Sequence, residues 1–213
     1  MSEAIYQEAM EAILKGDVDK AVDTAKKGID TGMNPLDLMD NGFISGINQV
    51  GDLFETGRLF LPQLVMSASA MEKATGIINA AIPEGKGSVS GKVLVGTVEG
   101  DVHDIGKTIV VALFKANGFD VLDIGRDAPI ERFIDEAEKF GADIIGSSTL
   151  LTTTMAVQKQ IEEELKKAGI RDKYKTLVGG APVTQRWADR IGADAYAQDA
   201  SDGVRKVKEL LAG

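Results

Sequence analysis

The chain contains one histidine, His103, which lies in the loop GDVHDIGK among acidic residues and glycines. Asp101 precedes it by two residues, so its carboxylate can hold one ring nitrogen and leave the other free. The chain has no cysteine, which excludes thiolate metal sites, iron–sulfur clusters and cysteine nucleophiles. One imidazole with carboxylates alone is a poor ligand set for zinc. A single oriented imidazole suits a metal whose other positions are filled by a macrocycle.

Plainer interpretations of the same residues stay open beside this one. A lone histidine in a loop is most often a surface residue, Asp101 could cap a helix, and Gly106 could open one. Gly179 and Gly180 could form an ordinary turn. The loop has neither Walker A nor GxGxxG spacing, so it does not predict nucleotide binding. The absence of GxSxG argues against a serine nucleophile elbow.

The elements that position the histidine loop alternate between strand and helix. Short apolar runs predict strands over 92–98, 120–125, 143–149, 175–180 and 194–198. Helical periodicity follows each of them, over 108–118, 130–141, 155–169, 183–192 and 202–212. Strict alternation predicts a five-stranded parallel sheet of the flavodoxin-like, Rossmann-like α/β class. The segments GDVHDIG, SSTLLTTT and GGAPV each follow a strand, so they are expected at the carboxyl edge, where such sheets bind ligands.

The first part of the chain has helical periodicity only. Apolar spacing predicts helices near 5–14 and 18–29, a third that starts at Asn34-Pro35 and runs to about Glu55, and a fourth from Pro62 to about Ala80. Short turns between them predict an antiparallel four-helix bundle. The segment PEGKGSVSG, residues 83–91, has the composition of a linker. The expected domains are therefore a helical cap over 1–82, the linker, and a ligand-binding domain over 92–213.

Composition excludes several classes of partner. The net charge of −9 argues against binding to nucleic acid or to an anionic membrane, since both need a basic surface. The N-terminus is acidic and amphipathic, unlike a signal peptide, and no apolar run approaches the length that spans a membrane. These features predict a cytoplasmic protein. Hydrophobic residues make up 44% of the chain, which is enough to form hydrophobic cores.

Three motifs in order resemble the cobalamin-binding module of cobalamin-dependent methyltransferases such as methionine synthase. DxHxxG is present as Asp101 to Gly106, SxL as Ser148 to Leu150, and GG as Gly179-Gly180. The intervals of 41 residues, 107 to 147, and 28 residues, 151 to 178, are similar to those of the family. The chain is most similar to the small corrinoid proteins of methylotrophic systems, which serve methylamines, methanol, betaines or methoxylated aromatics. The resemblance extends over nearly the whole chain, because the helical half also resembles the family's cap.

The resemblance implies a role for each matching residue. His103 becomes the lower axial ligand of cobalt, in place of the corrinoid's own base, and Asp101 hydrogen-bonds it. Thr154 stands where the family often has a serine that completes this relay. Further corrinoid contacts fall on Gly100, Val102, Asp104, Ile105, Gly106, Ser148, Leu150, Thr152, Gly179, Gly180 and Ala200. Among them, Ser148 and Thr152 are expected to face the displaced nucleotide tail, and Leu150 with the two glycines to shape its slot.

The helical half contributes four further candidates, in the segment GDLFETGRLFLPQLVMSA. It resembles the part of the cap that covers the reactive face of the corrinoid, and the matching positions are Phe54, Leu61, Leu64 and Val65. Apolar residues at this spacing are equally well explained as bundle core.

The function implied is that of a corrinoid methyl carrier. The expected cofactor is cobalamin or a related corrinoid, which cycles between methylcob(III)alamin and cob(I)alamin. A substrate-specific methyltransferase loads the methyl group, a second passes it to a thiol or a tetrahydropterin, and a reductive activase completes the set of partners. The chain has no segment left for a substrate-activating domain, so it is not expected to turn over alone.

Other functions on the same modules remain as alternatives. A B12-sensing regulator needs a DNA-binding domain, and neither extra length nor a basic segment is present here. The B12 subunit of a mutase usually lacks a helical cap with the FLPQ turn, which this chain has. A flavodoxin-like domain that binds no B12 is the third alternative.

Overall fold

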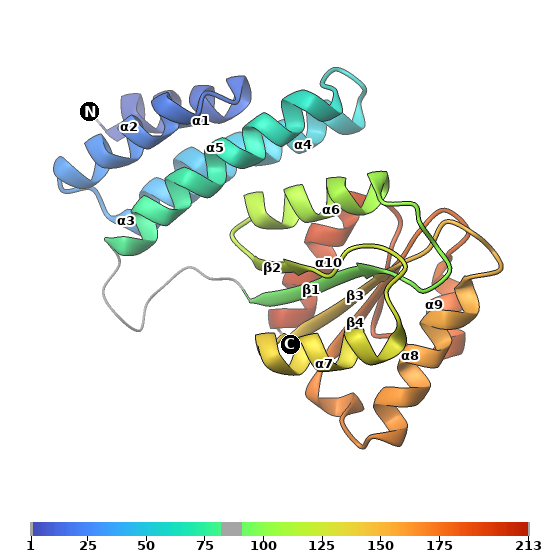
Figure 1. Cartoon of the computed structure of the whole chain (residues 1–213). Coiled ribbons are helices and arrows are strands. Elements are labelled where there is room, and N and C mark those ends of the chain that lie inside the picture. The colour runs from blue at the N-terminus through green and yellow to red at the C-terminus, as the bar shows by residue number, and fades with distance from the viewer. Residues whose placement is uncertain (1, 82–90, 213) are drawn as a thin grey trace. The chain divides into compact units, whose positions relative to one another are not determined.

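A computed structural model describes residues 2–81 and 91–212 and divides the chain into two compact units. One unit is formed by helices α1 to α5, and the other contains the five strands (Figure 1). The predicted linker, 83–91, lies outside the described residues except for Gly91, whose carbonyl oxygen accepts a hydrogen bond from Asp120 N at 3.0 Å. Over the described ranges, no helix is long and apolar enough to cross a membrane.

The α/β unit confirms the predicted parallel sheet. Its strands are β1 (Lys92–Thr97), β2 (Asp120–Asp123), β3 (Ile144–Ser148), β4 (Lys175–Gly179) and β5 (Ala195–Ala197), all parallel, in the order β2-β1-β3-β4-β5. The helices are α6 (Ile105–Ala116), α7 (Ile130–Phe140), α8 (Met155–Lys167), α9 (Gln185–Ile191) and α10 (Ala200–Ala212), with a 3₁₀ turn at Arg171–Lys173. This strand order is that of a flavodoxin-like doubly wound fold.

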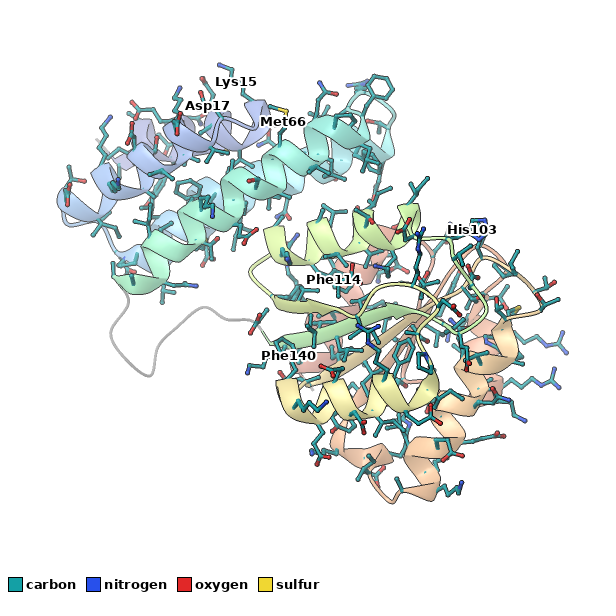
Figure 2. The ribbon with its side chains drawn as sticks, in the orientation of Figure 1. Lys15, Asp17, Met66, His103, Phe114 and Phe140 are labelled. Carbon is teal, nitrogen blue, oxygen red and sulfur yellow. The ribbon has the colours of Figure 1, made fainter. Side chains whose placement is uncertain are left out.

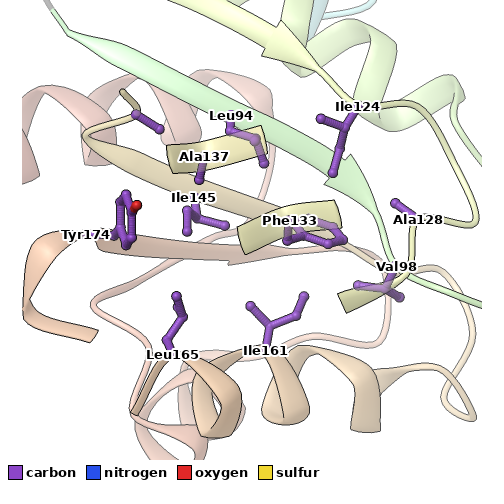
Figure 3. Close-up of a cluster of buried hydrophobic side chains, with 11 residues drawn as sticks. Leu94, Val98, Ile124, Ala128, Phe133, Ala137, Ile145, Ile161, Leu165 and Tyr174 are labelled. Carbon is purple, nitrogen blue, oxygen red and sulfur yellow. The ribbon is translucent and has the colours of Figure 1, made fainter. Parts of the chain in front are cut away.

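One buried cluster joins the sheet to the helices on one of its faces. Phe133 and Ala137 of α7 meet Ile161 and Leu165 of α8 over the strands, with Tyr174 at the end of the cluster (Figure 3). Alternate residues of β1 and β3, such as Leu94 and Ile145, supply the strand side of the contact. Helices α6 and α10 pack together elsewhere in the unit, since a methyl group on Gly203 would lie 3.2 Å from the Phe114 ring.

The strand order creates a switch point beside β1. The chain passes from β1 to β2 on one side and then returns to β3 on the other, so connections leave β1 in opposite directions. The loops that follow β1, β2 and β3 therefore lie side by side at the carboxyl edge. Beyond the ends of the strands, the loops after β1 and β2 are joined by an isolated parallel bridge between Val98 and Ala128.

The helical unit consists of α1 (Ser2–Lys15), α2 (Val18–Asp30), α3 (Pro35–Leu38), a π-helical stretch (Met39–Ile44), α4 (Ser45–Glu55) and α5 (Leu61–Ala80). The Asp17 carboxylate caps α2 by accepting from Lys20 N at 3.0 Å, and the Asn34 side chain caps α3. The turn at Gly16 packs directly against α5: φ is 63°, and a Cβ there would lie 2.6 Å from Met66 Cβ (Figure 2). A larger residue at this turn would push α1 and α5 apart.

The expected third helix from residue 35 to about 55 is present, but it is not α-helical throughout. Its residues Met39–Ile44 form the π-helical stretch between α3 and α4, which contains Gly42. A Cβ on Gly42 would lie 2.9 Å from Ala9 Cβ, and one on Gly46 would lie 3.0 Å from Met10 Cα. The segment therefore packs closely against α1. Apolar spacing over so few residues does not distinguish a π turn from an α turn.

Candidate functional site

Three loops at the carboxyl edge of the sheet form the site. The first runs from Val98 to Asp104 between β1 and α6, and it carries Asp101 and His103. The second, residues 124–129, follows β2, and the third, residues 149–154, follows β3. Each loop is held to its neighbour by backbone hydrogen bonds, from Thr97 N to Gly125 O at 2.9 Å and from Val98 N to Ser148 O at 3.1 Å.

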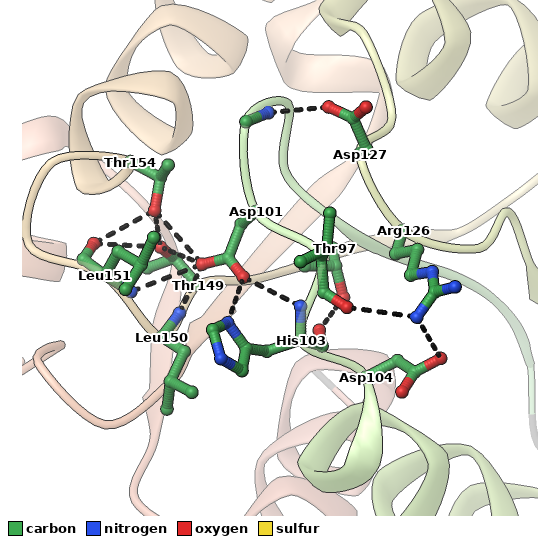
Figure 4. Close-up of polar contacts among 12 residues, drawn as sticks. Thr97, Asp101, His103, Asp104, Arg126, Asp127, Thr149, Leu150, Leu151 and Thr154 are labelled. Carbon is green, nitrogen blue, oxygen red and sulfur yellow. Dashed lines mark hydrogen bonds and ion pairs between the residues drawn. The ribbon is translucent and has the colours of Figure 1, made fainter.

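Asp101 binds His103 in two ways through a single oxygen (Figure 4). Oδ1 accepts the His103 backbone N–H at 3.1 Å and lies 3.1 Å from Nδ1 of the ring. With the ring hydrogen on Nδ1 donated to the carboxylate, Nε2 of the neutral imidazole keeps its lone pair. The His103 side chain is 51% exposed whereas that of Asp101 is 0% exposed. In that tautomer the pair presents one oriented nitrogen with a free lone pair to whatever binds at the edge.

The second carboxylate oxygen of Asp101 faces the loop after β3. Oδ2 accepts the backbone N–H groups of Leu150 at 2.7 Å and Leu151 at 3.2 Å. It also lies 3.2 Å from Thr149 Oγ1 and 3.1 Å from Thr154 Oγ1, and the two hydroxyls are 2.6 Å apart. Both hydroxyls are also within reach of Leu151 O, at 3.2 and 3.0 Å. The carboxylate is fully partnered although it is buried.

These contacts decide the charge of Asp101. Burial acts to raise its pKa, but the backbone N–H groups of Leu150, His103 and Leu151, together with the His103 side chain, outweigh it and hold the pKa well below its ordinary value. The group is therefore a carboxylate over the whole physiological range. A permanent carboxylate fixes the tautomer of His103 and makes Nε2 a better donor to a metal.

Exposed apolar side chains lie on the segments that carry and hold His103. Val102 is 58% and Ile105 70% exposed, both within two residues of His103, and Leu150 is 44% and Leu151 40% exposed in the loop after β3. Large exposed apolar side chains at one edge indicate a surface that binds something apolar. At Gly106 an added Cβ would meet no atom within 4 Å, so there is open space at the start of α6. A largely apolar ligand whose metal binds one nitrogen is compatible with these residues.

The site has few side chains that could ligate a metal. Within residues 2–81 and 91–212 there is no cluster of three or more histidine, cysteine, aspartate or glutamate side chains that could hold a metal ion. His103 is therefore not part of a conventional multi-residue metal site within these ranges. The macrocycle expected from the sequence is compatible with this ligand set.

The predicted slot residues meet where β3 and β4 end. Ser148 pairs with Gly179 in the strand register, and Thr149 N donates to Gly179 O at 3.2 Å. Gly180 has φ 124°, and a Cβ there would lie 1.7 Å from Thr149 O. The positive φ and the close approach to Thr149 both require glycine at this position, which lets the loop that binds Asp101 lie against β4.

Gln158 is a structural residue of this slot that sequence reasoning missed. It is 1% exposed, and its Nε2 donates to Ser147 O at 3.0 Å and to Gly179 O at 3.2 Å. Its Oε1 accepts from Trp187 Nε1 at 3.1 Å, which ties α9 to α8. A polar residue on the buried face of a helix is the only sequence signal it gives.

The remaining sequence-predicted residues occupy several places. Gly100 and Asp104 lie in the histidine loop, Thr152 is exposed in the turn before α8, and Ala200 begins α10 after β5. In the helical unit, Phe54 and Leu61 are half-buried, Leu64 is fully buried and Val65 is 44% exposed. The role of each in binding a cofactor stays a prediction.

Thr149 was placed in the SxL motif by its sequence, but no role was expected for it. The structure gives it the same contact with Asp101 that Thr154 makes. The amide groups of Leu150 and Leu151 were missed as well. Backbone donors have no side-chain signature, so only the fold could show them.

The fold and the site together define a class: a flavodoxin-like domain with one oriented histidine at the carboxyl edge of its parallel sheet, preceded in the sequence by a separate helical unit. Comparison with known proteins agrees. Residues 91–207 match a family model described as B12 binding domain, and residues 5–79 match a second model with the same description. The chain belongs to the B12-binding corrinoid proteins.

Its curated relatives match over their full length. The chain is 49% identical to the dimethylamine corrinoid protein of Methanosarcina barkeri, with 99% of each chain covered. It is 46% identical to trimethylamine corrinoid protein 1 of Methanosarcina acetivorans, with 98% of each covered. These identities confirm the expected similarity to the small corrinoid proteins of methylotrophic systems.

Solved structures give the same result. The methanol:cobalamin methyltransferase complex of Methanosarcina barkeri contains a chain with a TM-score of 0.83 and 32% identity, over 99% of this chain and 81% of that one. A cobalamin-binding protein from Desulfitobacterium hafniense has a TM-score of 0.76 at 28% identity, over 95% and 96%. The expected α/β fold with an N-terminal helical region is confirmed.

Proposed function

We propose that this chain is a methyl carrier that holds a corrinoid through His103 and passes methyl groups between two methyltransferases. The observation that supports it most directly is the Asp101–His103 pair, with Nδ1 of the ring 3.1 Å from a buried carboxylate and the ring half exposed among apolar side chains. The family assignment supports the identity of the cofactor as cobalamin or a related corrinoid.

Each protein group has a distinct task in this proposal. His103 Nε2 supplies the axial nitrogen, and Asp101 keeps its ring in one tautomer and orientation. The bound corrinoid supplies the cobalt centre that carries the methyl group. Thr149 and Thr154 hold Asp101 in place, so the imidazole does not depend on the cofactor for its orientation. The half-exposed ring would offer Nε2 to the cobalt, while the buried carboxylate holds its Nδ1 side.

Further parts of the corrinoid are proposed to contact the exposed apolar side chains near His103 and the ends of β3 and β4. Val102, Ile105, Leu150 and Leu151 cover apolar surface and exclude water from the axial bond. The edge formed by Ser148 and Gly179, braced by Gln158, is the proposed slot for the nucleotide tail. Phe54, Leu61 and Val65 are proposed to shield the opposite face of the corrinoid, whereas the fully buried Leu64 fits the alternative role in the core of the bundle.

Methylamines are the methyl donors that we infer for the partner enzyme. The relatives named after dimethylamine and trimethylamine are 44–49% identical to this chain. The structure from the methanol:cobalamin methyltransferase complex is 32% identical. That complex also supports a methyltransferase as the partner. A cytoplasmic location is part of the same proposal.

The test is a single-turnover transfer with isotope-labelled substrate. The corrinoid-loaded chain is reduced and mixed with ¹³C-methyl-labelled dimethylamine, with or without a dimethylamine-specific methyltransferase. We expect the label on the cofactor only when the methyltransferase is present, followed by release to a thiol acceptor when the second methyltransferase is added. Steady demethylation by the loaded chain alone would overturn the assignment as a carrier. A corrinoid that fails to bind at all would overturn it at an earlier step.

A further inference from the structure

Asp127, in the loop after β2, has an unusual backbone. Within the described ranges, it is the only residue other than glycine with a positive φ, at 50°. Left-handed backbone is unfavourable for residues with a side chain, although aspartate tolerates it better than most. Such a conformation persists when the surroundings require it, and it is found most often near functional sites. The contacts of Asp127 therefore indicate what the conformation is for.

Asp127 binds the histidine loop at two consecutive residues. Its Oδ1 accepts the Gly100 N–H at 2.7 Å (Figure 4), and its own N–H donates to Asp101 O at 3.0 Å. The left-handed turn thus points both the amide and the carboxylate of one residue at the main chain just before His103. An alanine at this position would keep at most one of these contacts, and it would retain the backbone strain.

Neighbouring residues extend the same contact. Arg126 Nη1 donates to Val102 O at 3.3 Å and lies 3.9 Å from Asp104 Oδ2. The loop itself is anchored at its base, because Asp123 accepts Gly125 N at 2.8 Å and pairs with the buried Lys107 of α6 at 2.5 Å. The loop after β2 is therefore a fixed support and not a free connection.

We propose that Asp127, with Arg126 beside it, is a positioning residue for His103. The loop after β2 holds the main chain of Gly100 to Val102, and the loop after β3 holds the side chain of Asp101. Clamped from both sides, the Asp101–His103 unit keeps its place at the sheet edge whether or not its ring bonds a metal. Neither Arg126 nor Asp127 was a candidate from the sequence, and neither reaches the ring. The inference rests on the proposed function only in taking His103 as the axial ligand.

Three variants separate this role from general stability. Asp127→Gly removes the carboxylate and relieves the left-handed backbone, so it tests the hydrogen bond alone. Asp127→Asn keeps an acceptor oxygen and tolerates the same backbone, so it should restore the contact. Asp135→Asn removes an exposed carboxylate from α7 and serves as the matched control.

The first readout uses the chain without corrinoid. Amide hydrogen exchange is followed residue by residue by NMR, at Gly100, at His103 and in α7. Because the lost bond involves a charged acceptor, we expect exchange at Gly100 to rise roughly tenfold or more in Asp127→Gly. Exchange at His103, whose N–H is bound by Asp101 and not by Asp127, should rise with it. Asp127→Asn should restore part of the protection through its neutral acceptor, and Asp135→Asn should match the wild type.

The second readout uses the corrinoid-loaded chain in its cobalt(II) state. The fraction of protein with a nitrogen of His103 on cobalt, measured by EPR, should fall in Asp127→Gly and recover in Asp127→Asn. A change confined to Gly100, or a rise in exchange that extends equally through α7, would overturn the positioning role. So would an unchanged histidine-bound fraction in Asp127→Gly. Absence of a histidine signal in the wild type would instead refute the proposed function. The exchange data would then still test whether Asp127 positions the loop that carries His103.

Discussion

Gly180 and Thr149 approach so closely that no side chain fits between them: a Cβ on Gly180 would lie 1.7 Å from the carbonyl oxygen of Thr149. Thr149 is also one of the groups that hold Asp101. The end of β4 and the histidine loop are therefore linked through a single residue, although they are far apart in the sequence. Disturbance at Gly180 should be felt at His103.

The variant Gly180→Ala tests this link. The added methyl group collides with Thr149, and φ of 124° is unfavourable for alanine, so we expect a loss of stability above about 1 kcal/mol. Gly141→Ala is the control, because φ there is 68° but no atom lies within 4 Å of the added Cβ. Urea unfolding should show the larger loss for Gly180→Ala. Equal losses would mean that only the backbone conformation matters and that the close approach to Thr149 does not.

The hydroxyls of Thr149 and Thr154 should act together on Asp101. Both hydroxyl oxygens lie within hydrogen-bond distance of Oδ2, and they are 2.6 Å from one another, so they share their two hydrogens in one network. Thr149→Val and Thr154→Val should each lower the free energy of unfolding by about 1 kcal/mol. In the double variant the two losses should not add, since residues in one network couple. The exposed neighbour Thr153→Val should change little, and strict additivity in the double-mutant cycle would contradict a shared network.

Asp101 should contribute to stability in a pH-dependent way. Its pKa in the folded chain lies below the ordinary value of about 3.9, so the folded state binds a proton less readily than the unfolded state. The contribution is fully present above the unfolded pKa and is lost as pH falls through the folded pKa. The stability difference between the wild type and Asp101→Asn should thus be constant near neutral pH and shrink below about pH 4. A difference that grows in acid would mean that the sign of the pKa shift is wrong.

The core over α7 and α8 should tolerate truncation poorly. Phe133 is fully buried between the sheet and Ile161, so Phe133→Ala should lower the free energy of unfolding by about 3–5 kcal/mol. Phe140, at the end of the same helix, is only partly buried against the cluster and should give a clearly smaller loss. Urea unfolding of both variants tests the order. A larger loss for Phe140→Ala would mean that the cluster is misplaced.

The sequence predicted the order of elements and the position of the site well. Alternating apolar runs and glycine stops located β1 to β5, and the switch-point rule placed His103, Thr154 and Gly179 at one edge. It could not predict Asp127, because its importance depends on a left-handed backbone and on a loop from another strand. Nor could it assign the amides of Leu150 and Leu151, since every residue has one. The π-helical stretch was missed because apolar spacing over six residues does not distinguish a π turn from an α turn.

The central claim is that His103 binds the cobalt of a corrinoid, and the chain offers a direct test because His103 is its only histidine. Untagged protein grown with ¹⁵N-histidine therefore carries the label in one side chain. After loading with cobalamin and reduction to cobalt(II), EPR reports which nitrogen lies on the metal axis. We predict that the nitrogen splitting changes from a triplet to a doublet in the labelled protein. A triplet that is unchanged by the histidine label, and that becomes a doublet only when the cofactor's own base is labelled, would contradict the account.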